Sequence, residues 1–238
     1  MKPNNHHTIS IIIPVLNEAN HISGLLEHLQ SEAQPKNLKE IIVVDGGSTD
    51  TTLELAKTKG AIVTRTEKGR AKQMNTGAKL AKGSVLYFLH ADTYPPKNYD
   101  QLILQAINSQ ISAGCFRMKF DTNKRFLHFF AWFSRINHKL CRGGDQSLFV
   151  LKELFHKTNG YNEDYIIYED SEFIGRLYKN ARFKVLPQHV MTSARKYEQN
   201  GTIRLQYHFG VIHLKNLLGF GPEKLYRYYK ENISSQSS

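Results

Sequence analysis

Three polar groups, each placed where an apolar run of the sequence ends, carry side chains suited to ligand chemistry. They are Asn17-Glu18, Asp45-Gly46-Gly47 and His90-Ala91-Asp92. Carboxylates accept hydrogen bonds from N–H and O–H groups, and with an imidazole they can bind a divalent cation. One such group at a strand end is unremarkable, but three at successive strand ends favour a shared nucleotide-binding site.

Asp45 ends an apolar segment, where a charge without a partner is costly. The N–H groups of uracil or a similar base could supply that partner. Gly46 and Gly47 would let a ligand approach the backbone closely. The alternative is a tight turn with a capping aspartate, whereas a dinucleotide-binding turn is disfavoured because the G-x-G-x-x-G fingerprint is absent.

His90 and Asp92 are two positions apart, so on an extended segment their side chains project to the same side. An imidazole and a carboxylate could therefore converge on one Mg²⁺ or Mn²⁺, which would neutralise a diphosphate. The alternative is a polar exit from strand to loop.

Glu169 and Asp170 begin a predicted helix. A carboxylate there could take the proton from an acceptor hydroxyl during group transfer. An acidic helix start stabilised by the helix dipole explains the same residues equally well.

Other polar residues are candidates for contacts around such a site. Arginine suits bidentate phosphate contact and lysine gives a point charge, although a solvated surface charge is the commoner role for either. The set comprises Arg70, Lys72, Arg195 and Lys196 for an anionic donor, Gln73 and Asn75 for its base, and Gly143, Gly144, Asp145 and Gln146 for an acceptor pocket or a strand-entry turn.

The elements that would position these residues alternate between strand and helix over the first part of the chain. Such alternation predicts a mostly parallel sheet flanked by helices, with a ligand beyond the carboxyl ends of the strands. The predicted strands are 8–15, 40–45, 61–65 and 84–89, and the helices between them are 18–30, 51–59 and 71–80. Beyond them we predict helix 99–108, strand 113–120, an aromatic-rich amphipathic helix 125–140, strand 147–151, helix 169–179 and a helical tail 202–232 broken near 219–222.

Composition indicates a globular protein with anionic partners. The 238 residues carry a formal net charge of +11 and are 40% hydrophobic. Zinc-finger cysteine spacing, an arginine-rich arm and an aromatic-basic RNA-binding signature are all missing, so we expect no nucleic-acid partner. The two cysteines do not make a disulfide framework, and no apolar run approaches the ~20 residues of a spanning helix. We therefore expect a cytosolic protein with disordered ends.

The segment 203–218 mixes apolar residues with arginine, lysine and histidine. Such a helix can lie on an anionic membrane, at its inner face in this case, or pack on the domain as a closing element. Both interpretations stay open on the sequence.

The strings Ile11–Glu18, Val43–Asp50 and His90–Asp92, with Glu169-Asp170 further on, resemble family 2 glycosyltransferases of the GT-A fold. The resemblance extends over roughly residues 8–200. It implies a GT-A nucleotide-diphospho-sugar transferase fold with a Rossmann-like sheet, and a catalytic domain 1–200 with a nucleotide part 8–95, an acceptor part 96–200 and a helical extension 201–238.

The resemblance also implies roles for individual residues, with Mg²⁺ or Mn²⁺ as cofactor. Asp170 would be the catalytic base, and the acceptor would be a small molecule or a lipid-linked one. By the resemblance, Pro14, Glu18 and Asp45 would hold the nucleoside, Asp92 would contact the metal and the diphosphate, and Arg195 and Lys196 would bind the diphosphate. With the candidates chosen from residue types added, the predicted donor site, for UDP or a related nucleotide, comprises Pro14, Asn17, Glu18, Asp45, Gly47, Arg70, Gln73, Asn75, Ala91 and Asp92. The predicted metal ligands are Asp92 and His90, and the predicted acceptor residues are Gly144, Asp145, Gln146 and Glu169.

The chain departs from the family where His90 stands in place of the first aspartate of Asp-x-Asp. His90 could ligate metal, bond to ribose or orient Asp92. The string Leu89–Thr93, together with 144–146, 192–196 and 217–225, resembles a subgroup named for arsenosugar biosynthesis.

The sequence thus predicts an inverting sugar transferase in which Asp45, Asp92 and Asp170 meet around one cleft. One alternative is a nucleotidyltransferase that makes a sugar nucleotide. It is disfavoured because 14–20 lacks a glycine-rich basic loop. The other is an inactive nucleotide-binding module that docks on membranes, against which the three intact aspartates argue.

Overall fold

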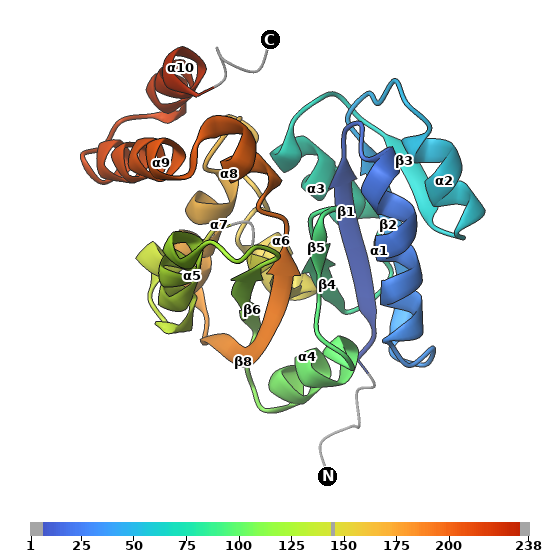
Figure 1. Cartoon of the computed structure of the whole chain (residues 1–238). Coiled ribbons are helices and arrows are strands. Elements are labelled where there is room, and N and C mark those ends of the chain that lie inside the picture. The colour runs from blue at the N-terminus through green and yellow to red at the C-terminus, as the bar shows by residue number, and fades with distance from the viewer. Residues whose placement is uncertain (1–6, 144–145, 234–238) are drawn as a thin grey trace.

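The computed structural model describes residues 7–143 and 146–233. Within these ranges the chain forms an α/β fold around an eight-stranded mixed sheet of order β3-β2-β1-β4-β7-β6-β8-β5 (Figure 1). The sheet is parallel from β3 to β4, which is the arrangement that the alternating sequence predicts, and β7 then runs antiparallel to both of its neighbours.

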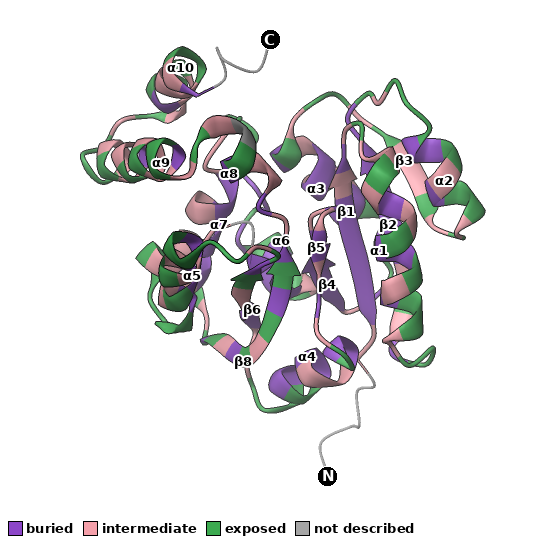
Figure 2. Cartoon of the chain, in the orientation of Figure 1, coloured by how far each residue is buried: buried purple, intermediate pink, exposed green. Residues whose placement is uncertain are grey.

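In the parallel half, β1, β4 and the second part of β2 are buried on both faces, whereas β3 is a partly exposed edge strand. Their bounds are β1 Ile9–Val15, β2 Leu38–Asp45, β3 Ile62–Arg65 and β4 Val85–Phe88, and the helices between them are α1 Ala19–Ser31, α2 Thr52–Thr58 and α3 Arg70–Leu80. Ile11 and Ile13 face α1 and α4 (Tyr99–Asn108), whereas Ile12 faces α3 and α7 (Glu169–Asn180). This alternation follows the two-residue period of a strand, and it places a helical layer on each face of the sheet. Figure 2 shows the buried residues concentrated along this sheet.

The second half adds β5 Thr93–Tyr94, β6 Ala113–Phe120, β7 Leu148–Leu151 and β8 Phe183–Thr192. The sequence did not predict β8. Its pairing with β6 shifts register after Leu186, and Pro187 lies in that irregularity. Proline cannot donate to a sheet ladder, and Lys184, Gln188 and His189 interrupt the apolar residues of β8, so the strand carries little of the usual signal. Two short helices, α6 Lys152–Lys157 and α8 Arg195–Asn200, were also not predicted.

The predicted helix 125–140 was too long. Helix α5 spans Arg125–Trp132 and is followed by the 3₁₀ turns η1 Phe133–Arg135 and η2 Lys139–Cys141. The buried guanidinium of Arg142 donates to the backbone carbonyls of Ser134 and Ile136. In a continuous helix those carbonyls would accept from backbone N–H groups four residues later. Here they accept from the buried Arg142 side chain instead, and the helix ends at Trp132.

Cys115 and Cys141 are free thiols, as predicted. Cys115 is fully buried, and this burial raises the pKa of its thiol despite the Arg142 guanidinium beside it. The thiol is therefore a buried, protonated group.

The tail forms α9 Thr202–Leu217 and α10 Pro222–Asn232, with the break at the predicted place. Gly219 has a φ of +82° and Pro222 opens α10, so the chain turns there. Both helices pack on α5 and α8 through a third apolar cluster that includes Leu127, Tyr197 and Leu225. None of the helices in the described ranges is long and apolar enough to cross a membrane.

Two helical glycines give a matched test of the packing between α3 and β1. We expect Gly77→Ala to destabilise the fold by about 1–3 kcal/mol, because the added methyl group would lie 2.4 Å from Cγ2 of Ile12. Gly175→Ala, in α7, should instead stabilise by about 0.5–1 kcal/mol, since a Cβ there meets nothing within 4 Å. Urea denaturation of both variants measures the difference, and effects of the same sign would contradict this packing.

Candidate active site

The loops after β1 and β2 are tied into one unit at the carboxyl edge of the sheet. Val15 pairs with Asp45 in the ladder. The Asn17 side-chain oxygen accepts from the backbone N–H of Thr49 at 2.9 Å, and the Asn17 backbone N–H donates to Ser48 Oγ at 2.8 Å. The first two polar groups of the sequence therefore lie together, as predicted from their strand ends.

Asp45 is fully buried at this edge. Its Oδ1 accepts from the Ser48 backbone N–H at 2.9 Å, whereas Oδ2 accepts no hydrogen bond, although Arg65 Nε lies 3.5 Å away. A buried carboxylate oxygen without a hydrogen bond costs free energy. It is suited to receive an N–H group of a ligand. Arg65 was not among the predicted site residues, and its place at the end of the next parallel strand was the signal that could have found it.

Gln73 stands behind this edge on α3. Its Nε2 donates to the carbonyls of Val15 and Val44, each at 2.8 Å, so both donors of the amide hold the ends of β1 and β2. A Cβ on Gly46 would lie 3.1 Å from this amide, and Gly47 has a φ of +103°. The glycines are thus required by the turn and by the close approach of α3.

Arg195 joins the first polar group to the third. Its Nη2 lies 3.1 Å from Glu18 Oε1 and 3.7 Å from Asp92 Oδ2, and its Nη1 lies 3.0 Å from His21 Nε2. One guanidinium, 41% exposed, thereby brings together two carboxylates from the ends of β1 and β4. His21 was not predicted, although it follows Glu18 by one helical turn.

Asp170 approaches His90, the first residue of the third polar group, on the side opposite to Arg195 in the chain of contacts. Its Oδ2 lies 3.9 Å from His90 Nε2, and both side chains are nearly buried. They line a small cavity whose remaining walls are mostly apolar. These other residues are Met74, Phe88, Gly143, Ser147, Leu148 and Ile174.

Glu169, beside the base candidate, is almost fully buried and lies 3.6 Å from Arg70 Nη1. Burial raises the pKa of Glu169, and the nearby positive charge of Arg70 opposes that rise. The hydroxyl of Tyr161 is buried next to the same acids. Its pKa is raised well above the ordinary value, first by burial and then by the charge of Asp170. Tyr161 is a further site residue that the sequence analysis missed.

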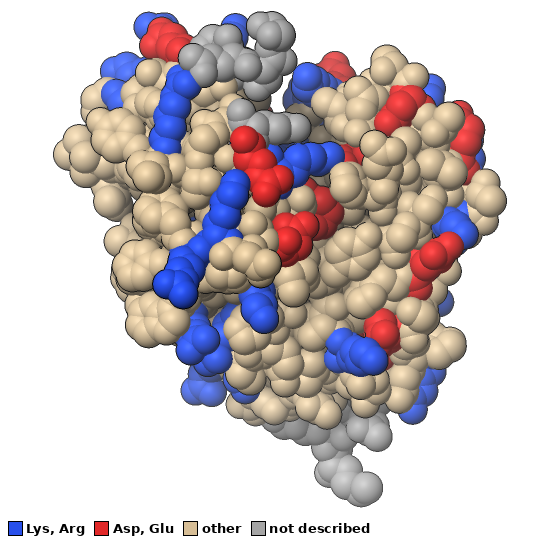
Figure 3. Space-filling view, in the orientation of Figure 1, with Lys and Arg blue, Asp and Glu red and all other residues tan. Residues whose placement is uncertain are grey.

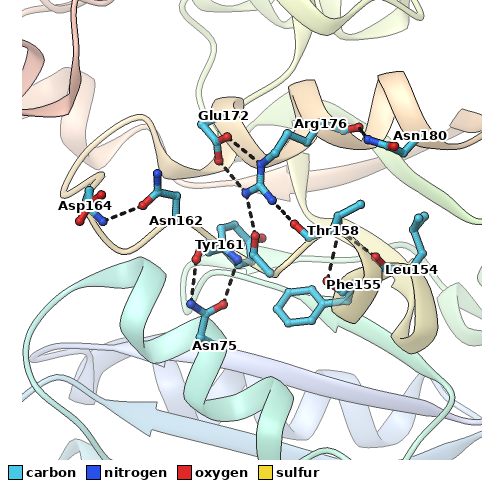
Figure 4. Close-up of polar contacts among 11 residues, drawn as sticks. Asn75, Leu154, Phe155, Thr158, Tyr161, Asn162, Asp164, Glu172, Arg176 and Asn180 are labelled. Atoms are coloured by element: carbon cyan, nitrogen blue, oxygen red, sulfur yellow. Dashed lines mark hydrogen bonds and ion pairs between the residues drawn. The ribbon is translucent and has the colours of Figure 1, made fainter.

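Gln73 and three other predicted site residues have polar groups engaged by the protein itself. The amide of Asn75 bonds to the backbone of Tyr161 (Figure 4). It also donates to Glu163, so it holds the loop before α7. Lys196 lies over the rings of Phe209 and Tyr229 in the tail.

Gln146 is buried, accepts from Arg142 and donates to the Cys141 carbonyl. It therefore helps to hold the buried guanidinium that ends α5. Gly144 and Asp145 lie outside the described residues.

The residues present fit a cation only if a ligand completes its shell. No three His, Cys, Asp or Glu side chains in the described ranges are grouped so that they could hold an ion by themselves. Magnesium commonly uses one or two carboxylates together with phosphate oxygens and water. Asp92, with His90 two residues before it, suits an ion of that kind.

Contacts, together with the short chain segments 17–18 and 90–92, connect Asp45 to Asp170. Asp45 connects through the Ser48 loop to Asn17-Glu18, Glu18 through Arg195 to Asp92, and His90 faces Asp170. In Figure 3, acidic and basic side chains gather at the centre of this face, between the two halves of the molecule. Asp45 and Asp92 therefore follow strands β2 and β4 at the same edge of the sheet, and Asp170 lies beside His90 from the start of α7.

The sequence is similar to known glycosyltransferases. Residues 10–158 match the model described as Glycosyl transferase family 2. The PGL/p-HBAD biosynthesis glycosyltransferase of Mycobacterium bovis is 31% identical over 211 residues, which cover 78% of this chain and 75% of that protein. A second relative comes from Methanococcus voltae and is 33% identical over 99 residues, which cover 38% of this chain and 31% of that protein. Its name is dolichyl N-acetyl-alpha-D-glucosaminyl phosphate 3-beta-D-2,3-diacetamido-2,3-dideoxy-beta-D-glucuronosyltransferase.

Other relatives are longer than this chain. Glycosyltransferase AglE of Haloferax volcanii is 34% identical over 98 residues, which cover 38% of this chain and 32% of AglE. The match to the succinoglycan biosynthesis protein ExoA of Rhizobium meliloti spans 57% of that protein. Neither the family match nor these relatives point to the arsenosugar-type subgroup, and they do not favour a nucleotidyltransferase or an inactive module.

Solved structures share the fold. S. aureus TarS 1-349 in complex with UDP superposes with a TM-score of 0.66 at 23% identity, covering 78% of this chain and 60% of that one. Mannosyltransferase PcManGT from Pyrobaculum calidifontis, in complex with GDP-Man and Mn²⁺, superposes with a TM-score of 0.71 at 18% identity, covering 95% and 70%. The fold is GT-A-like, as the sequence resemblance implied.

The burial of Glu169 has a consequence for stability. Because the pKa of Glu169 in the folded chain is raised above its ordinary 4.5, the unfolded chain releases this proton first as pH rises. Stability is therefore full below the ordinary pKa and falls as pH rises through the raised one.

We expect Glu169→Gln to melt above the wild type at neutral pH, with the gap closing in acid. The exposed Glu153→Gln serves as control in thermal melts across pH. A gap that widens as pH falls would contradict the raised pKa.

Proposed function

Because the chain belongs to glycosyl transferase family 2, we propose that it transfers a sugar from a nucleoside-diphosphate donor to an acceptor hydroxyl, with inversion at the anomeric carbon. The observation that supports the proposal is the series of contacts and short chain links that connects Asp45, Asp92 and Asp170. In the proposal, one donor molecule spans a nucleoside site at Asp45, a diphosphate site at Asp92 and the base Asp170.

The nucleoside would lie over the ends of β1 and β2. Asp45 Oδ2 offers a buried acceptor without a hydrogen bond, which suits the N3–H of uracil. Pro14, Asn17 and Glu18 would line the ribose side, and the positive φ of Gly47 keeps its backbone accessible. The UDP named in the TarS complex supports a UDP-type donor. Because the PcManGT complex contains GDP-Man, GDP-sugars are also included in the activity assay below.

The diphosphate would lie near Ala91 and Asp92, at the end of β4. A bound Mg²⁺ or Mn²⁺ would be held there by Asp92, with His90 as second donor, and would offset charge on the leaving diphosphate. Arg195 presents a partly exposed guanidinium beside Asp92, and Arg70 presents another beside Glu169. Both can turn toward phosphate oxygens. Lys196, on α8 and held over rings of the tail, would act at longer range.

Asp170 would act as the general base. Its carboxylate lines a cavity with Met74, Leu148 and Ile174, which would exclude water from the reacting hydroxyl. Asp170 takes the hydroxyl proton as the acceptor oxygen bonds to the anomeric carbon, and the bond from that carbon to the diphosphate oxygen breaks in the same step. Glu169 is proposed on the acceptor side, next to the base.

We propose a lipid-linked acceptor at the cytosolic face of a membrane. Support comes from the dolichyl phosphate acceptor in the name of the Methanococcus voltae relative, and from free cysteines that suit a reducing compartment. Helix α9 would touch the membrane through exposed apolar side chains. These are Ile203, Tyr207, Leu214, Leu217 and Leu218. A small-molecule acceptor and membership of the arsenosugar-type subgroup rest on the motif strings alone.

Replacing the proposed base separates chemistry from binding. Asp170→Asn should lower the transfer rate by about 10²–10⁴-fold while nucleotide affinity is kept, because the amide cannot accept the proton. Turnover with UDP-sugars and GDP-sugars, together with calorimetric titration of UDP, measures both quantities. The exposed Asp164→Asn, in the loop before α7, is the matched control and should retain activity. Near-normal turnover in Asp170→Asn would remove the assignment.

The two strand-end aspartates should affect nucleotide binding differently. Ligands that bind only the folded state raise the melting temperature, so UDP can be titrated by thermal shift with and without Mn²⁺. Asp45→Asn should reduce the shift in both conditions, because it removes an acceptor for the base. Asp92→Asn should remove mainly the extra shift that Mn²⁺ adds. If the two variants behaved alike, the division between nucleoside and diphosphate would be wrong.

A further inference from the structure

Helix α5 presents a row of large aromatic side chains to solvent. Phe126, Phe129 and Trp132 are 37%, 58% and 50% exposed, and Ile136 and Leu140 beyond the helix are 41% and 46% exposed. Single exposed apolar residues are ordinary, but a contiguous apolar patch marks an interaction surface.

The exposed aromatics form one patch. Ring centroids of Phe129 lie 5.5 Å from Phe130 and 5.2 Å from Phe133, and Trp132 lies 5.5 Å from Phe133. The opposite side of α5 supplies Leu127 and Ala131 to the buried cluster shared with the tail. One side of α5 is thus packed in the protein core, and within the described structure the other side is open to solvent.

Basic residues surround the patch. Residues 122–143 contain no Asp or Glu. The exposed cations in this stretch are Lys124, Arg125, Arg135 and Lys139. Glu198 approaches at the margin, where it lies 3.7 Å from Lys124.

The positive field extends onto the neighbouring strands. Burial lowers the pKa of His189 on β8, and the charges of Arg117, Arg135 and Lys119 lower it further. In Figure 3, a line of Lys and Arg side chains crosses the part of the molecule where α5 lies in Figure 1.

We propose that this aromatic-basic surface, formed by α5 with Arg117, Lys119, Arg135, Ile136, Lys139 and Leu140, docks the protein on an anionic phospholipid bilayer. Trp and Phe settle at the boundary between headgroups and acyl chains, and Lys and Arg are attracted to anionic headgroups. A second copy of the chain is a poorer occupant, since it would bring two sets of cations together. The surface is separate from α9, and its docking does not depend on sugar transfer.

The composition supplies a direct probe, because Trp132 is the chain's one tryptophan. Tryptophan emission, excited at a wavelength that tyrosine does not absorb, therefore reports on this surface alone. With phosphatidylcholine vesicles containing phosphatidylglycerol, we expect the emission of the full chain to shift to shorter wavelength and to be quenched by lipids brominated on the acyl chain. Pure phosphatidylcholine, or high salt, should largely abolish both effects.

Vesicle sedimentation with paired variants locates the contact. Phe129→Ser combined with Phe126→Ser should weaken partitioning at least about tenfold, whereas Ile62→Ser, at a 44% exposed site on β3, should not. Replacing Arg125, Arg135 and Lys139 by Gln should weaken it similarly, in contrast to the same change at the exposed Lys39, Lys57 and Lys79.

Two results would overturn the proposal. One is vesicle binding that leaves Trp132 fluorescence unchanged and depends instead on Ile203 and Leu217 of α9. The other is a fluorescence shift that follows protein concentration without vesicles, with dimers on size exclusion. Because no donor or acceptor is present, neither result bears on the proposed transfer.

Discussion

The guanidinium of Arg195 lies between two carboxylates, Glu18 and Asp92, that come from the ends of strands β1 and β4. Parallel strands deliver their carboxyl ends to one edge, so acids placed there repel one another unless a cation is shared among them. Here that cation comes from α8, far along the chain, after β8 has returned to the same edge. The second half of the fold is therefore required for the charge balance of the first.

The cavity lies where the parallel half of the sheet gives way to the antiparallel β7. His90 follows β4, Gly143 and Ser147 precede β7, and Asp170 opens α7 on the face above them. At such a change of strand direction the connecting loops leave the edge in different directions and open a crevice. Asp170 reaches the crevice from a helix start, where the dipole favours a negative charge. Arg70, the first residue of α3, places a positive charge 3.6 Å from the deeply buried carboxylate of Glu169.

The sequence was sufficient for the strand-end residues and insufficient for the contacts that cross the molecule. Strands β1, β2 and β4 were predictable because they form compact apolar runs, and β3 because it alternates in the sequence with the helices around it. Strand β8 was hidden by Pro187 and by the polar residues that interrupt its apolar ones, and the end of α5 by Arg142, whose partners lie several residues upstream. The roles of Asn75 and Gln146 were equally hidden. Their amides serve the Tyr161 loop and Arg142, and no local pattern indicates which polar group a side chain will meet.

The net charge of +11 indicated anionic partners but could not distinguish among them. In the structure the basic side chains fall into two groups, which differ in the residues around them. Arg195, Arg70 and Arg65 each lie beside a carboxylate, so a diphosphate arriving there competes with existing ion pairs and is bound only where its geometry is better. The cations around α5 adjoin exposed aromatic rings and have few acids near them. Such a field is not selective for one small anion, but it is matched to an extended anionic surface with an apolar interior. In the two proposals, the positive charge of this chain serves two kinds of partner, and the acids or aromatic rings beside each cation decide which partner it suits.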